Sequence, residues 1–403
     1  MNAGWKIEPL KALCEFRRGL TYSKSDEVET SDTIVLRANN IDLAANLLNL
    51  NDLHYITDEK KVPADKRVLK DSIIVCTASG SKSHLGKVAY IGSDYGFAFG
   101  GFMGMVTPKV VLHAEYLFHM MTSPSYKKFI DELSDGVNIN NLRFEDLGRF
   151  PVPYPPLVEQ RRIVSILNKA FEGIATAKAN AEKNLQNARA LFESHLHSVF
   201  ADAWQTHSLG TLSALASNIT DGDHLPPPKS DSGVPFITIR NIIKRTRQID
   251  FADTFKVPHN YFNALKENKR PRRGDVLYTV TGSFGIPVTV GANTEFCFQR
   301  HIGLIRPASE TDSAWLYYLL LSPQVIRQAE GGATGAAQRT VSLAVLRNFE
   351  VPIVPIQQQK AMTRKLDSLS LETQRLEGTY QQKLVALEGL KKTLLHEAFT
   401  GNL

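Results

Sequence analysis

The sequence is poor in cysteine, with three among 403 residues, Cys14, Cys76 and Cys297, and no CxxC pair. This count excludes a disulfide framework and favours a reducing, cytoplasmic setting. No apolar run of about 18 residues is present, as a membrane-spanning helix would need, and the N-terminal residues do not resemble an export signal. We therefore expect a cytoplasmic protein without a membrane partner.

Motifs for chemistry are also missing. No GxxxxGK[ST] loop occurs, so we expect no nucleotide hydrolysis. The prolines of 151–156 (PVPYPP) stand in the wrong order for the Pro-Pro-aromatic motif of an aminomethyltransferase, and the glycines of 96–104 do not form its cofactor loop. His195 and His197 would lie on different faces of a helix and make a poor metal pair. We expect no catalytic residue, no metal site and no cofactor on this chain.

Acidic and basic residues are nearly balanced, with a net charge of +6. The excess is concentrated in residues 203–349, which hold 16 Lys and Arg against 11 Asp and Glu. A modest basic excess of this kind suits an anionic partner such as nucleic acid.

The chain contains a long internal repeat. FPVPYPPLVEQRRIVSIL at 150–167 returns as FEVPIVPIQQQKAMTRKL at 349–366, shifted by 199 positions, and 115–130 matches 314–329 at the same shift. Trp5 and Trp204 open similar segments, so the unit is a globular domain followed by a helix, present twice. In both copies prolines precede the helix, as at a strand-to-helix junction.

Each copy ends in a heptad pattern, and we predict long helices over 156–200 and 356–399. The expected contact rows are 164, 167, 171, 174, 178, 181, 185, 188, 192, 195 and 199 in the first helix, and 362, 366, 369, 373, 376, 380, 383, 387, 390 and 394 in the second. Neither helix can bury such a stripe alone, so we expect the two to pack antiparallel, with pseudo-twofold symmetry between the copies. Independent coiled coils with other chains are the alternative. The expected domains are 1–155, 156–202, 203–354 and 355–403, and the globular parts are of the α+β or α/β class.

Polar loops occupy equivalent places in the two copies and are candidates for base contacts, because Asn, Gln, Arg, Lys and Ser can all bond base edges. The candidates are Arg37, Asn39, Asn40, Ser81, Lys82, His84, Asn138, Asn140 and Asn141 in the first copy and Arg240, Asn241, Thr281, Ser283, Phe284, Gln338 and Arg339 in the second. Turn chemistry at strand ends is the other interpretation of Arg37, Asn39, Asn40, Arg240 and Asn241. Candidates for phosphate contacts are Lys244, Arg245, Arg247, Lys269, Arg270, Arg272 and Arg273.

With these features in place, the chain resembles a specificity subunit of a type I restriction-modification system. The resemblance extends from the Trp-led domain starts through DGDHLPPP at 221–228, the Ser-Pro helices and both helix junctions. It implies two target recognition domains, two spacer helices and a split double-stranded DNA site. It also implies two methyltransferase subunits that bind S-adenosylmethionine and two restriction subunits that use ATP with Mg²⁺. Gln358 departs from the pattern, since the first copy has Glu159 there.

The resemblance also places contacts to the modification subunits near the helix starts, at Gln160, Arg161, Gln359 and Lys360. Two alternatives stay open: a recognition part of a fused methyltransferase-nuclease, and a coiled-coil adaptor without a DNA role. The adaptor would keep the helices but would not explain two matching sets of loops.

Overall fold

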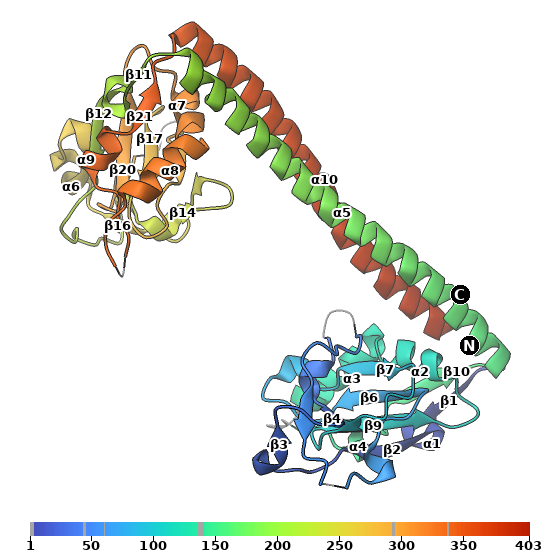
Figure 1. The fold of residues 1–403 in the computed structure, drawn as a ribbon. Helices are drawn as coiled ribbons and strands as arrows, with labels where there is room; N and C mark the ends of the chain where they lie inside the picture. The colour runs from blue at the N-terminus through green and yellow to red at the C-terminus, as the bar shows by residue number, and fades with distance from the viewer. Residues whose placement is uncertain (1–3, 43–45, 60, 136–140, 292–294, 337) are drawn as a thin grey trace. The chain divides into compact units, whose positions relative to one another are not determined.

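A computed structural model describes residues 4–42, 46–59, 61–135, 141–291, 295–336 and 338–403 (Figure 1). The chain divides into two compact units, Met1–Glu182 with Gln381–Leu403, and Lys183–Tyr380. Each unit holds one globular domain and one part of each long helix, α5 (Leu157–Thr206) and α10 (Ile356–Thr400). The boundaries of the units along the sequence therefore fall within α5 and α10.

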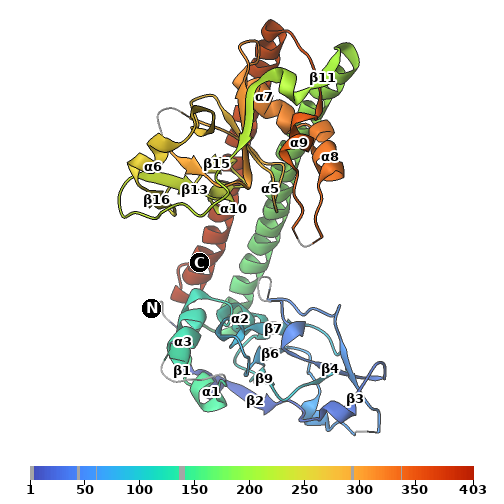
Figure 2. The ribbon, with the colours of Figure 1, turned by 90° about the vertical axis from the view of Figure 1, so that its left-hand side faces the viewer.

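The first domain is built on two four-stranded sheets. One has the order β2-β9-β6-β7, whose strands are labelled in Figure 2, and is antiparallel throughout. The other has the order β3-β5-β4-β8, with β4 and β8 parallel. A separate pair joins β1 to β10, so the start of the domain pairs with the prolines that precede α5. The strands are β1 (Lys6–Pro9), β2 (Cys14–Arg18), β3 (Glu27–Val28), β4 (Thr33–Leu36), β5 (His54–Ile56), β6 (Ser72–Cys76), β7 (Val88–Ile91), β8 (Ala98–Phe99), β9 (Met103–Pro108) and β10 (Pro151–Tyr154).

The second domain has the same plan. Its larger sheet has the order β12-β20-β17-β18, the smaller has β16-β13-β19, and β11 pairs with β21 as β1 does with β10. A hairpin of β14 and β15 is added. The strands are β11 (Leu209–Thr211), β12 (Ala216–Asp221), β13 (Val234–Ile237), β14 (Ile242–Ile243), β15 (Gln248–Ile249), β16 (Phe255–Val257), β17 (Val276–Thr279), β18 (Pro287–Thr289), β19 (Cys297–Phe298), β20 (Ile302–Pro307) and β21 (Glu350–Pro352).

The Ser-Pro dipeptides end one helix and start the next. Ser322 caps α8, its hydroxyl accepting from the Val325 N–H, and Pro323 takes the first helical position, where its missing N–H costs nothing. Ser123 and Pro124 do the same for α3. The shorter helices are α1 (Leu10–Leu13), α2 (Ala114–Met120), α3 (Pro124–Asp135) and α4 (Phe144–Leu147) in the first domain, and α6 (His259–Ala264), α7 (Ser313–Leu320), α8 (Pro323–Gly332) and α9 (Leu343–Arg347) in the second.

The long helices run antiparallel within each unit. Lys178 of α5 bonds Glu388 of α10 at 2.9 Å in the first unit, and Arg189 bonds Glu377 at 3.1 Å in the second. All four side chains are substantially exposed, so each pair contributes only about 0–1 kcal/mol. The apolar contacts beneath them contribute most of the helix packing.

The expected heptad seam of α5 is present, since its eleven positions are all buried or half-buried. In α10 the row of Leu366, Thr373, Tyr380, Leu387 and Leu394 is also turned inward. The second predicted row is wrong over its last three positions, because positions 376, 383 and 390 are exposed and 377, 384, 391 and 398 take their place. From Thr373 onward the spacing along the seam is four then three, whereas the sequence was interpreted as three then four.

One buried glutamine at the start of each long helix bonds that helix to the globular domain before it. Gln160 accepts from the His113 N–H at 2.7 Å and donates to the carbonyls of Val111 at 3.0 Å and Pro155 at 2.8 Å. Gln359 repeats this pattern exactly 199 positions later, with Asp312, Glu310 and Val354 as its partners. Both side chains are nearly inaccessible. The repeated P-x-x-x-Q segment is thus a structural joint between domain and helix.

One apolar core in each unit runs from the sheet into the helices. In the first unit Tyr116 meets Phe399 of α10 edge-on at 5.2 Å, and in the second Phe200 of α5 lies 6.0 Å from Trp315. Burying one such ring stabilises a fold by roughly 1.5–3 kcal/mol. Among the described residues, no helix is both long and apolar enough to cross a membrane.

Candidate nucleic-acid interface

Three loops meet in the first domain at the end of β6 and the start of β9, in the sheet of order β2-β9-β6-β7. The Leu142 N–H donates to the Thr77 carbonyl at 2.6 Å, and Ala78 forms a bridge with Asn141. The Ala78 N–H donates to the carbonyl of Phe102 at 3.1 Å. The loop after β6 therefore lies between the loop before β9 and the segment before α4.

The second domain brings together the same three loops. The Val341 N–H donates to the Val280 carbonyl at 2.8 Å, Thr281 bridges Thr340, and the Val280 N–H donates to His301 at 2.9 Å. The polar loops that the sequence places at equivalent positions of the two copies are thus held by the same backbone hydrogen bonds in both domains.

The candidate residues of the first domain lie mainly on exposed turns. Ser81 and Lys82 are exposed and His84 is half-buried on a short turn, where the Ser81 and Ser83 hydroxyls are 2.8 Å apart. Asn141 is exposed beside Ala78. Two further candidates in these loops, Asn138 and Asn140, lie outside the described residues.

In the second domain the two candidate loops contact each other through side chains. The Arg339 guanidinium lies over the Phe284 ring, 5.5 Å from its centre, and donates to the Glu330 carbonyl. Ser283 and Gln338 are exposed next to them. Thr281 differs, because it is 5% exposed and its hydroxyl is 3.3 Å from that of Thr340. We therefore assign Thr281 to the loop frame and not to a contact surface.

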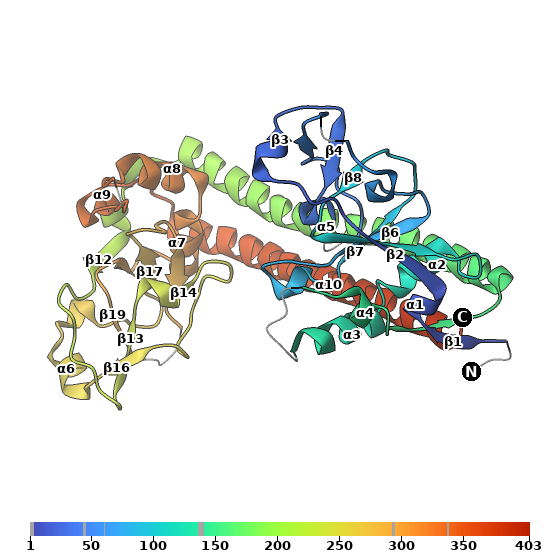
Figure 3. The ribbon, with the colours of Figure 1, turned by 90° about the horizontal axis from the view of Figure 1, so that it is seen from below.

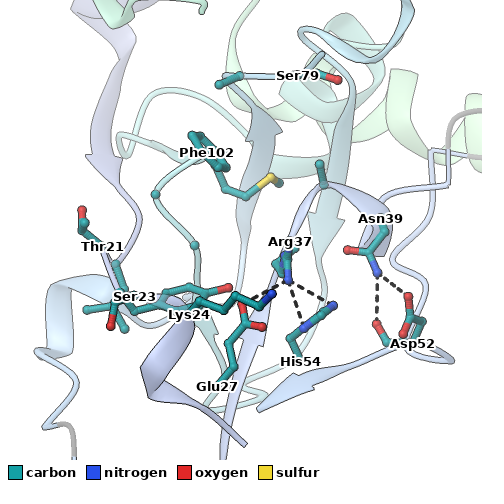
Figure 4. A pocket seen from close by; sticks show the side chains of 17 residues that line it. Thr21, Ser23, Lys24, Glu27, Arg37, Asn39, Asp52, His54, Ser79 and Phe102 are labelled. Atoms are coloured by element: carbon teal, nitrogen blue, oxygen red, sulfur yellow. Dashed lines mark hydrogen bonds and ion pairs between the residues drawn. The ribbon is translucent and has the colours of Figure 1, made fainter. Parts of the chain in front are cut away.

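A pocket of about 650 Å³ opens beside the loops of the first domain, between the segment after β2 and the end of β4. Arg37, Asn39, Ser79 and Phe102 line it (Figure 4). Arg37 is 3.0 Å from His54 and 3.5 Å from Glu27. The pocket thus joins the strand-end candidates to the loop candidates.

Asn40 and Asn241 correct the expectation of ligand contacts at the strand ends. Asn40 is 0% exposed, accepts from the Arg37 N–H at 2.8 Å and donates to the Asp52 carbonyl at 2.8 Å. Asn241 is 5% exposed and makes the same bonds with Thr238 and Asp253. The turn interpretation therefore holds for these two asparagines. Arg240 is exposed.

The basic candidates of the second domain fall into two groups. Lys244, Arg245 and Arg247 are exposed on the hairpin of β14 and β15, which lies beside α7 (Figure 3), and Arg247 bonds the Tyr317 hydroxyl. The second group, 269–273, is largely engaged within the domain. Lys269 donates to the Gly222 carbonyl at 3.0 Å, Arg270 to backbone carbonyls, and Arg272 pairs with Glu267, while Arg273 is exposed.

The four residues expected to contact the partner fall into one buried pair and one exposed pair. Gln160 and Gln359 are buried and fully bonded inside the chain, so we withdraw them from the contact set. Arg161 and Lys360, one position later in each helix, are exposed.

The sequence did not point to one exposed aromatic residue at the pocket and two glycines at close backbone contacts. Phe102 is 72% exposed at the pocket, and a Cβ on Gly19 would lie 2.0 Å from the Gly100 carbonyl oxygen. Gly222 meets the Phe298 carbonyl oxygen in the same way at 1.9 Å. These two glycines are 203 positions apart, so a search at 199 passes over them.

The described residues contain no cluster of three metal-ligating side chains. The cysteines are buried and unpaired, and burial raises the pKa of Cys14 and of Cys297 to about 12. Both thiols therefore stay protonated, which makes them poor nucleophiles.

Comparison with known proteins gives one family. The family described as "Type I restriction modification DNA specificity domain" matches twice, over residues 2–186 and 203–386. The chain is 24% identical to the type I restriction enzyme EcoKI specificity subunit of Escherichia coli (strain K12), covering 99% of this chain and 89% of that protein. It is also 24% identical to the StySPI specificity subunit of Salmonella potsdam, with the same coverage.

Two solved structures are similar in fold. One, from a study of complex assembly and conformational transition of the type I R-M system, matches with a TM-score of 0.80 at 18% identity, covering 100% of this chain and 99% of that chain. The HsdS subunit from Thermoanaerobacter tengcongensis matches with a TM-score of 0.62 at 18% identity, covering 100% and 98%.

Proposed function

Since the chain belongs to the family of type I restriction modification DNA specificity domains, we propose how it performs the work of a specificity subunit. Each globular domain reads one half of a split double-stranded DNA site. The observation that carries this proposal is the repeated three-loop frame, which presents different side chains in the two domains. Two frames with unlike side chains fit two unlike half-sites.

The base-reading residues that we propose are the exposed and half-buried candidates around these frames. In the first domain they are Arg37, Asn39, Ser81, Lys82, His84 and Asn141, together with Asn138 and Asn140. In the second they are Arg240, Ser283, Phe284, Gln338 and Arg339. Lys244, Arg245, Arg247 and Arg273 contact phosphates, where they add affinity without sequence information.

The chain works without catalytic groups of its own. We propose that it recruits two methyltransferase subunits, which carry S-adenosylmethionine, and two restriction subunits, which carry ATP and Mg²⁺. Purified chain mixed with DNA and S-adenosylmethionine should transfer no methyl group until the methyltransferase partner is added. Transfer by the chain alone would overturn this part.

Arg161 and Lys360 are our proposed contacts to the methyltransferase subunits. They are exposed at the starts of α5 and α10, next to the buried joints. Charge reversal at both positions should weaken pull-down of the methyltransferase partner and leave the thermal unfolding midpoint unchanged. Full retention of the partner would show that the contact lies elsewhere.

Methylation-site sequencing of cells that carry the chain and its methyltransferase partner tests the two-reader proposal. Exchanging Ser81, Lys82 and His84 for alanine should change one half of the methylated motif only. Exchanging Ser283, Gln338 and Arg339 should change the other half only. A change in both halves from one set, or a motif without two halves, would contradict it.

A further inference from the structure

The pocket of the first domain holds a donor and an acceptor that match one particular base pair. We propose that Arg37 reads guanine and that Asn39 reads the cytosine paired with it, so that this pocket requires one G·C pair in the first half-site. This assignment rests on the proposed function, and it names the chemistry of one contact within it.

Arg37 is held in place by side chains from two other strands. Its Nη1 is 3.0 Å from Nδ1 and 3.2 Å from Nε2 of His54, and 3.5 Å from Oε1 of Glu27 (Figure 4). Nη1 lies at nearly equal distances from the two ring nitrogens, so it rests against the imidazole ring without selecting one nitrogen as its acceptor. Because these contacts hold the Arg37 guanidinium in place before DNA binds, less conformational entropy is lost on binding.

The remaining donors of Arg37 are open to a ligand. Among the described residues, no hydrogen-bond partner reaches Nε or Nη2, and 39% of the side-chain surface is exposed at the pocket. A guanidinium with two available N–H groups matches O6 and N7 of guanine, the pair of acceptors that guanine presents in the major groove.

Asn39 offers the complementary group. Its Nδ2 donates to Oδ2 of Asp52 at 2.7 Å and to the Asp52 carbonyl at 3.3 Å, which leaves Oδ1 as an acceptor (Figure 4). Cytosine presents the N4 amino group, a donor, in the major groove. An A·T pair would put the adenine N6 donor against the guanidinium, so the same two side chains reject it.

The second domain shows that this cluster is not needed for the fold. The pair Val35 and His54 on β4 and β5 corresponds to Phe236 and Phe255 on β13 and β16. The buried asparagines also correspond, since Asn40 and Asn241 each donate to an aspartate carbonyl at 2.8 Å. The backbone frame is therefore the same at both sites.

Within that common frame the side chains at the pocket positions differ. Thr238 stands where the first domain has Arg37, and Arg240 where it has Asn39. Ser230 pairs with β16 in the way that Val28 pairs with β5, so the residue before it, Lys229, occupies the position of Glu27. The Lys229 ammonium lies over the Phe255 ring, 5.4 Å from its centre. The four positions thus vary while the frame remains, as expected of residues that determine specificity.

Arg37→Gln is the direct test, made in the full chain with its methyltransferase partner. Gln can bond N6 and N7 of adenine, so the variant should lose the guanine requirement at one position of the first half-site and admit adenine there. Loss of a bidentate contact should reduce discrimination about ten- to a hundred-fold. The readouts are methylation-site sequencing and competition binding with duplexes that differ at that base pair.

His54→Phe and Glu27→Gln test the two positioning residues. The strand position of His54 already holds Phe255 in the second domain, so His54→Phe should fold. Each variant should relax the same base pair as Arg37→Gln, by a smaller factor, and no other position. Arg149→Ala is the matched control, because this exposed arginine pairs with Asp146 and does not line the pocket.

The outcomes separate this inference from the proposed function. If the wild-type chain directs no split motif, the proposed function fails, and the inference with it. If the wild-type motif is split but Arg37→Gln and His54→Phe leave the first half-site unchanged, the inference alone is wrong. A uniform loss of binding at every base pair would make Arg37 a phosphate contact and would also overturn it.

Discussion

Gln160 is a single side chain on which the attachment of α5 to the first domain depends. Its amide bonds one partly buried N–H, one partly buried carbonyl and one buried carbonyl. Gln160→Ala leaves the buried Pro155 carbonyl without a partner, while the partly exposed His113 N–H and Val111 carbonyl can bond water, so we expect the free energy of unfolding to fall by about 1–3 kcal/mol. Urea unfolding followed by circular dichroism measures it. Arg161→Ala is the control and should stay within about 0.5 kcal/mol.

A loss of partner binding without any loss of stability in Gln160→Ala would contradict the structural assignment. Such a result would return Gln160 to the set of partner contacts. The equivalent experiment at Gln359 should agree, because its three bonds are the same.

The sequence repeat predicted where Gln160 and Gln359 stand but not what they do. A constant shift of 199 marks equivalent positions, whereas burial depends on how the loops of 111–113 and 310–312 fold back on the helix. The sequence also could not show that Arg37 corresponds to Thr238. The shift at this point is 201 residues instead of 199, and since an arginine and an asparagine follow the strand in both copies, the sequence alone does not choose between alignments. Loop lengths change the shift, so equivalences near the pocket needed the strand register.

At the scale of elements, we expect the contact between α2 and α5 in the first unit to weaken in acid. Nε2 of His119 is 2.8 Å from Oδ1 of Asn168, and burial lowers the pKa of His119. A lowered pKa in the folded state means that the unfolded chain binds the proton first, so the stability contributed by neutral His119 is present above about pH 6.5 and is lost as pH falls through the folded pKa.

We therefore expect the thermal midpoint of the first unit to fall on acidification from pH 7 to 5. His119→Gln keeps a donor for Asn168 without a titrating ring and should lose part of that dependence. The second unit supplies an internal comparison, since the Tyr318 hydroxyl donates to Asp367 at 2.7 Å in the equivalent place. An unchanged pH profile in His119→Gln would exclude the histidine as its source.

The β14-β15 hairpin is an element that we expect to add affinity without specificity. Lys244 and Arg245 are exposed there. Replacing both with alanine removes two phosphate contacts, so the slope of log K against log salt should become shallower by about 0.9 per contact. Binding titrations of the complex at several salt concentrations measure this, and the methylated motif should not change. An altered motif would make the hairpin a base reader.

Lys269→Ala is the matched comparison for the hairpin. Its Nζ bonds the Gly222 carbonyl at 3.0 Å beneath the 222–230 loop. We expect this variant to lower stability more than it changes the salt slope. From the sequence, all seven basic residues were predicted to contact phosphates, because a run of Lys and Arg looks the same whether its side chains are solvated or bonded within the domain. The backbone carbonyls that accept from Lys269 and Arg270 distinguish the two groups, and these carbonyls are visible only in the structure.

For the whole molecule, the heptads illustrate what sequence patterns specify. The apolar rows predicted two long helices, and α5 and α10 begin at Leu157 and Ile356, next to the expected starts. The sequence could not place the second row of α10. Leu376 and Leu390 fit a three-then-four spacing, and Leu384 and Ala398 fit a four-then-three spacing equally well. The partner helix decides between two registers that are equally apolar.

The spacing of the two half-sites follows from the fact that both readers belong to one chain and must contact one duplex. Two recognition domains can enter major grooves on the same side of B-DNA when their half-site centres lie about 10 base pairs, or a multiple of it, apart. We therefore expect the methylated motif to contain a fixed, unread gap consistent with this spacing. Inserting about 5 base pairs into that gap turns one half-site to the opposite side of the duplex. Binding of the complex should then fall to the level of a single half-site, measured with duplexes of graded gap length. Equal affinity for every gap would show that the two domains do not read one site together.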